Sequence, residues 1–180
     1  MKKSINNIIF KSLVVLMRVF FGLGWFLAGL TKMTGKTGEV SWYYQPTVFL
    51  TEYLTKALEK PNVPVFYKDF IDGVALHHVP FFNYSIPLVQ IMLGVFLIVG
   101  FMTLPAICIC LFMHINFILS GNMNLISLTL YTSAFGLLFF RNDALILSLD
   151  RYFKVEDLFK VKKPNHHKRT RIQKKLNYKL

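Results

Sequence analysis

The chain of 180 residues is more apolar than a soluble domain of this length needs, because 54% of its residues are hydrophobic and 16% are aromatic. Its net charge of +12 does not indicate a nucleic-acid-binding protein, since 12 of the 21 Lys and Arg residues follow Phe140 and the middle of the chain is almost uncharged. The composition therefore argues against a soluble fold and against a nucleic-acid partner, and it favours an integral membrane protein.

The first predicted element is a membrane-spanning helix over residues 8–31, with the charge of Arg18 deep within it. At 1.5 Å per residue, this run is long enough to cross about 30 Å of hydrocarbon. A cleaved signal peptide is the alternative, because Lys2 and Lys3 precede the apolar stretch. The stretch is, however, longer than the apolar core of a typical signal peptide.

An outer loop of residues 32–81 follows, and two amphipathic helices are predicted within it. Apolar residues recur at helical spacing over residues 49–58 and again over residues 66–75. Glu52 and Lys56 form a favourable i,i+4 pair in the first of these helices. Two hypotheses are open for the pair of helices: they form a lid over an internal site, or they rest in the headgroup region of the membrane.

Three further apolar runs, separated by short turns, predict the remaining spans. They cover residues 82–104, 105–120 and 125–140. Pro105 suits the first turn of a helix, where its missing N–H costs no hydrogen bond.

The two cysteines, Cys108 and Cys110, lie in the third apolar run at a spacing that points them to nearly opposite sides of a helix. They therefore cannot readily form a disulfide with each other, and both are interpreted as buried apolar side chains. No Cys and His spacing typical of a metal site occurs in the sequence, so no bound metal is predicted.

The distribution of charge predicts the orientation of the four spans. The segment from Lys32 to Ser85 contains five basic and five acidic residues, whereas the part from Arg141 onward contains 12 basic and four acidic residues. Because short cytoplasmic segments are enriched in Lys and Arg, both termini are placed in the cytoplasm and the loop outside.

The predicted fold is all-α: a four-helix transmembrane domain over residues 1–153, with an extracytoplasmic amphipathic helical loop, in the cytoplasmic membrane. A basic cytoplasmic tail, residues 154–180, either adheres to anionic membrane lipids or only sets the topology.

Five polar or ionisable side chains within the predicted spans form a candidate ligand-binding site, because such groups are costly at membrane depth. They are Arg18, Gln90, His114, Asn116 and Tyr131. Arg18 and His114 each lie about ten residues from the cytoplasmic end of a span, which places both at a depth of about 15 Å and lets them share one cavity. His114 is either a neutral imidazole bonded across helices or a proton donor or acceptor to a bound headgroup. Arg18 either binds carbonyl groups as a structural charge or receives an anionic ligand.

Four motifs occur in order between Ser12 and Phe153. They are Arg18, Gly22, Phe26, Ala28, Gly29 and Lys32 in the first span, Gln90, Gly94 and Gly100 in the second, and the segments Arg141–Ala144 and Leu149–Tyr152. Together they resemble the pattern of the DoxX/DoxD-like family of membrane proteins, in which a glutamate often stands where this chain has Gln90.

The resemblance implies a four-helix membrane fold, and the relatives it suggests include the small subunit of a thiosulfate:quinone oxidoreductase. The leading hypothesis is a membrane subunit of a redox system that binds a quinone-like or other lipophilic molecule within the bundle, with Arg18 and His114 contacting its polar head. If the chain is enzymatic, it is a quinone-linked oxidoreductase subunit, with a quinone as its cofactor and a redox protein or a second copy of the chain as its partner. No catalytic residue is predicted. The alternative is a non-enzymatic membrane scaffold or accessory protein that engages partner proteins through its outer loop and basic tail.

Overall fold

The structure, a computed structural model, describes residues 2–35 and 41–153, and these residues form helices and turns without strands. The all-α class is therefore confirmed for this part of the chain, whereas the basic tail predicted at residues 154–180 lies outside the described residues. The helices are α1 (Lys2–Thr34), α2 (Val48–Glu59), α3 (Val65–Phe70), the π-helical turn η1 (Ile71–Ala75), the 3-10 turn η2 (Leu76–His78), α4 (Val79–Val99), α5 (Thr103–Leu119), α6 (Leu125–Phe139), α7 (Arg141–Ala144) and α8 (Leu149–Tyr152).

Within the described part of the chain, two helical stretches are long and apolar enough to cross a membrane, Ile5–Thr34 and Val65–Val99. The first is most of α1, and the second combines α3, η1, η2 and α4. The helices α5 and α6 are also apolar but have only 17 and 15 residues.

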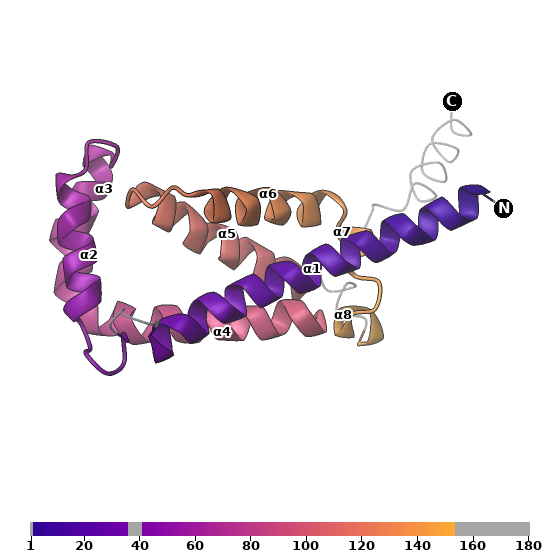
Figure 1. Ribbon diagram of the computed structural model, residues 1–180, viewed down its shortest axis with the longest axis horizontal. Coiled ribbons are helices and arrows are strands. Elements are labelled where there is room, and N and C mark those ends of the chain that lie inside the picture. Colours follow the sequence, from indigo (N-terminus) through magenta and orange to yellow (C-terminus); the bar gives the residue numbers. More distant parts are fainter. Residues whose placement is uncertain (1, 36–40, 154–180) are drawn as a thin grey trace, which may run out of the picture.

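The longest helix, α1, packs along α4 (Figure 1). Glycines let the two backbones approach closely. A Cβ atom added at Gly94 would lie 2.5 Å from the main-chain nitrogen of Phe26. One added at Gly29 would lie 2.7 Å from the carbonyl oxygen of Pro87. Both distances are shorter than van der Waals contact, so the α1 and α4 pair depends on residues without side chains at these positions, as is common where apolar helices pack in membranes.

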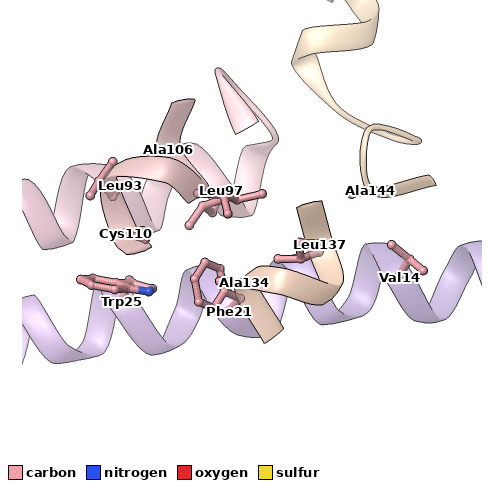
Figure 2. Close-up of a cluster of buried hydrophobic side chains, with 11 residues drawn as sticks. Val14, Phe21, Trp25, Leu93, Leu97, Ala106, Cys110, Ala134, Leu137 and Ala144 are labelled. Carbon is pink, nitrogen blue, oxygen red and sulfur yellow. The ribbon is translucent and has the colours of Figure 1, made fainter. Parts of the chain in front are cut away.

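One cluster of buried apolar side chains joins α1, α4, α5, α6 and α7 (Figure 2). Its members are Val14, Phe21, Trp25, Leu93, Leu97, Ala106, Ile107, Cys110, Ala134, Leu137 and Ala144. The prediction that both cysteines are buried is confirmed for Cys110 but wrong for Cys108, which is exposed. The two-residue spacing turns Cys108 to the opposite, outward face of α5.

The turn between α4 and α5 begins earlier than the predicted boundary at Leu104. Helix α4 ends at Val99 because Gly100 adopts a left-handed conformation, with φ of 70°, which glycine accepts without a Cβ clash. Helix α5 then begins at Thr103, so that Pro105 lies within its first turn, where the missing N–H costs no hydrogen bond.

The two amphipathic helices predicted in the loop are present. The first is α2, which buries Leu50, Leu54 and Ala57 along one face. The second is α3 together with η1, and it continues through η2 into α4. Figure 1 shows α2 and α3 at one end of the molecule, whereas the N-terminus, α7 and α8 lie toward the opposite end.

Candidate functional site

A cavity of about 470 Å³ lies where α2, α3 and η1 cover the adjoining ends of α1, α4 and α5. We call residues 48–75 the lid, because they form one wall of this cavity. The apolar part of the wall consists of Trp42, Phe49, Leu50, Leu54, Phe70, Ile71, Ala75, Phe82, Ile86, Phe112, Met113 and Phe117. A largely apolar wall with a few polar groups, at this volume, is typical of a site for a small lipophilic molecule.

Two tyrosines on the buried face of the lid join it to the end of α5. The hydroxyl of Tyr53 lies 2.6 Å from Oγ of Ser120, and the hydroxyl of Tyr67 donates to Oδ1 of Asn116 at 3.0 Å. All four side chains line the cavity. Burial raises the pKa of Tyr53 above its ordinary value, so its hydroxyl is neutral at physiological pH and can donate or accept a hydrogen bond.

A lysine lies in the cavity wall at the end of α1. The Nζ atom of Lys32 is 5.8 Å from the ring centres of both Trp42 and Phe117, and it donates to the carbonyl oxygen of Ala28 at 3.2 Å. Cation–π contacts of this kind stabilise an ammonium group at the edge of an apolar space. The wall therefore presents hydroxyl, amide and ammonium groups beside aromatic rings.

The five predicted site residues do not share this cavity. Asn116 is the one that lines it. His114 and Tyr131 lie together outside the lining, with their rings stacked at a centroid distance of 5.8 Å. Gln90 is buried on α4, and Arg18 is buried among residues of the opposite end of the molecule.

Arg18 binds main-chain carbonyl groups, which is one of the two roles considered for it. Its guanidinium donates to the carbonyl oxygen of Ala144 at 2.7 Å and to that of Leu147 at 3.1 Å. These bonds hold α1 to the end of α7 and to the segment that joins α7 and α8. The structure does not bring Arg18 and His114 into one cavity, because His114 instead contacts Trp25, at 6.4 Å between ring centres.

An acidic residue also lies buried at the α7 and α8 end, outside the four predicted spans. The carboxylate of Asp150 accepts hydrogen bonds from the main-chain N–H groups of Met102 and Thr103, at 2.6 and 2.7 Å. It thus satisfies two free donors at the start of α5, where negative charge is favourable. The negative charge of Asp150 also acts on the positive charge of Arg18 through space.

The polar residues of the cavity other than Asn116 are absent from the predicted site. Tyr53 and Tyr67 gave a signal in the sequence, because each places a phenol on the apolar face of an amphipathic helix, where its hydroxyl needs a partner. Lys32 was noted in the sequence only as part of the DoxX-like motif, and Ser120 gave no signal, because a polar residue commonly ends an apolar run.

Comparison of the chain with protein-family models, with curated proteins and with solved structures found no match. The resemblance to the DoxX/DoxD-like family thus stays a prediction that depends on the sequence motifs. Among the residues that the structure describes, no three His, Cys, Asp or Glu side chains converge in a way that would hold a metal ion.

Proposed function

We propose that the chain is a polytopic membrane protein in which α1, α4, α5 and α6 span the bilayer. Their outward surfaces carry large exposed apolar side chains, among them Ile8, Phe20 and Phe139. Such a surface is unfavourable in water and favourable against lipid. The 17 residues of α5 and the 15 of α6 are short for a span, and local thinning of the bilayer or flanking residues accommodate the difference.

The lid lies on the extracytoplasmic side in this proposal, and both termini lie in the cytoplasm. The excess of basic residues after Phe140 supports this orientation through the positive-inside rule. The position of α7 and α8 toward the same end as the N-terminus, opposite the lid, agrees with it (Figure 1).

The function that the geometry supports best is binding of a lipophilic molecule, of the quinone-like type, in the cavity beneath the lid. The single observation that carries the proposal is a cavity of about 470 Å³ with aromatic walls on the buried face of an amphipathic lid. Asn116, Tyr53, Tyr67 and Ser120 supply hydrogen bonds to the carbonyl or hydroxyl groups of the ligand head. Arg18 is a structural charge in this proposal. The proposed role in a redox system is supported by the resemblance of the sequence motifs to the DoxX-like family.

Quenching of tryptophan fluorescence by a short-chain ubiquinone, in protein purified in mild detergent, tests this function. The chain contains two tryptophans, and Trp42 lines the cavity, so bound quinone should quench it in a saturable manner. Asn116→Leu should weaken binding by about tenfold, which corresponds to about 1.4 kcal/mol. The matched control Asn142→Leu changes an exposed residue of α7 and should leave the binding constant unchanged. Absence of saturable quenching in the wild-type protein, or equal binding constants in the two variants, would refute the proposal.

A second function, that of a scaffold, is favoured by exposed apolar residues at the lid end of the molecule. Tyr44, Val65 and Phe66 project large side chains away from the cavity and are mostly exposed. A partner protein that covers them would make the lid a docking surface rather than the cover of a ligand site. Affinity purification in mild detergent separates the two functions, because a scaffold retains a stoichiometric partner, whether a redox protein or a second copy of the chain, and contains no extractable lipophilic ligand.

A further inference from the structure

Three side chains in the interior of the bundle have buried polar atoms without a hydrogen-bond partner among the described residues. They are Nε1 of Trp25, Oε1 of Gln90 and Nε2 of His114. The side chains are 3, 2 and 5% exposed, respectively. A buried polar atom without a partner costs about 1–3 kcal/mol, so three of them in one region require an explanation.

The packing of α1 against α4 places Gln90 at a defined level of α1. Gly94 meets the backbone of Phe26, and Gly29 meets the backbone of Pro87. Because Gln90 lies between Pro87 and Gly94 on α4, it is level with the turn of α1 between Phe26 and Gly29.

Trp25 directly precedes that turn of α1, and its ring lies 6.4 Å from the ring of His114 on α5, at an angle of 66° between the planes. The three unpartnered atoms therefore come from three helices, on side chains whose backbones lie within about one helical turn of one another along the bundle. Two other buried polar atoms without a partner, on Arg18 and Thr103, lie at the α7 and α8 end of the molecule, near Asp150. The group of three is also distinct from the cavity under the lid, since none of its members lines that cavity.

The chemistry of the three atoms defines the molecule that would satisfy them. The indole N–H of Trp25 only donates, Oε1 of Gln90 only accepts, and Nε2 of His114 does either according to its tautomer. A guest must therefore both accept and donate hydrogen bonds, and it must fit within a close-packed interior. Water meets these requirements, and buried waters typically make about three hydrogen bonds to otherwise unsatisfied groups.

We propose that Trp25, Gln90 and His114 form an internal water site, separate from the lipophilic cavity and independent of whether that cavity binds a quinone. The water accepts from Trp25, donates to Gln90 and completes its hydrogen bonds with His114. A water at this site hydrates the interior of the bundle where the surrounding side chains are apolar. It also gives His114 a partner for proton exchange.

Nuclear magnetic resonance of detergent-solubilised protein with ¹⁵N-labelled tryptophan tests the site directly. The full chain gives two indole N–H signals, and Trp25→Phe identifies the one from Trp25. A cross-relaxation peak between this proton and water is expected in the wild-type protein and should be lost or greatly weakened in Gln90→Met. Absence of the peak in the wild type would overturn the proposal, and a peak unchanged in Gln90→Met would show that no water is shared between the two side chains.

Thermal unfolding of Gln90→Met gives a second test whose sign distinguishes the alternatives. Methionine has nearly the shape of glutamine but no polar oxygen. If water bonds to Oε1, the substitution lowers the midpoint of unfolding by several degrees, because it removes one partner of the water. If Oε1 has no partner at all, removing it raises the midpoint, which contradicts the proposal. Gln45→Met, at an exposed position, is the matched control and should leave the midpoint unchanged.

Discussion

Replacement of Gly100 by alanine should destabilise the protein strongly, and the structure gives the size of the effect. Gly100 has a φ of 70°, a conformation that costs an L-residue about 1–2 kcal/mol. The new Cβ would lie 2.5 Å both from Nη1 of Arg18 and from Cβ of Ser148. Arg18 would then have to move and lose at least one bond from its charged group to a carbonyl, at about 1.5–3 kcal/mol. The sum is a loss of about 2.5–5 kcal/mol in the free energy of unfolding.

Thermal unfolding in mild detergent, followed by circular dichroism, measures this loss. A chain of this size is expected to unfold about 5–20 °C lower for a loss of about 2.5–5 kcal/mol. Gly121→Ala is the matched control for backbone strain, because Gly121 has a φ of 78° but its nearest neighbour is Cδ of the flexible Lys60 side chain. Gly73→Ala controls for the substitution alone, since its Cβ meets nothing within 4 Å, and it should stabilise the helix by about 0.5–1 kcal/mol. If Gly100→Ala were no more destabilising than Gly121→Ala, Arg18 would not be held in the position described.

Further substitutions test the other contacts by the same unfolding measurement. Gly94→Ala should cost about 1–3 kcal/mol or more, because its Cβ meets the backbone of Phe26, which moves only if α1 and α4 separate; an unchanged midpoint would contradict this packing. Asp150→Asn should cost about 1–3 kcal/mol, since an amide offers one acceptor oxygen to the two N–H groups at the start of α5 and carries no charge; an equal or higher stability would argue against its capping role. Tyr67→Phe should cost only about 0.5–1.5 kcal/mol, through the lost bond to Asn116, and a larger effect would indicate that the hydroxyl does more than hold the lid.

The sequence was sufficient for the helices but not for the way in which they meet. Long apolar runs and amphipathic spacing predict α1, α2 and α6 to within a few residues of their ends, apart from the N-terminal extension of α1. The end of α4 was missed because Gly100 lies inside a continuous apolar run, where hydropathy does not distinguish a turn from a helix. Gly22, Gly29 and Gly94 were named from the sequence as parts of the DoxX-like motifs, and the structure shows that their close neighbours lie on α1 and α4.

The partners of Arg18 were beyond sequence reasoning for a physical reason. Its acceptors are the carbonyl oxygens of Ala144 and Leu147, 126 and 129 residues further along the chain, and every residue carries such an oxygen. A bond to the main chain therefore leaves no signature in the type of either acceptor residue. The acid that acts on Arg18, Asp150, was equally hidden, because it lies beyond the last of the four predicted spans.

The cavity could not be predicted because it depends on how α5 is oriented and on where the lid packs, rather than on any one pattern. The two ends of α5 are held by different kinds of hydrogen bond. At its start, the Asp150 carboxylate caps the helix, whereas at its end Ser120 and Asn116 bond to the neutral phenols of Tyr53 and Tyr67. Hydrogen bonds that involve a charged group are roughly twice as strong as those between neutral groups. The free energy needed to open the lid end should therefore be lower than that needed to open the α7 and α8 end. Because the cavity lies at the lid end, a ligand can reach it while the rest of the bundle stays packed.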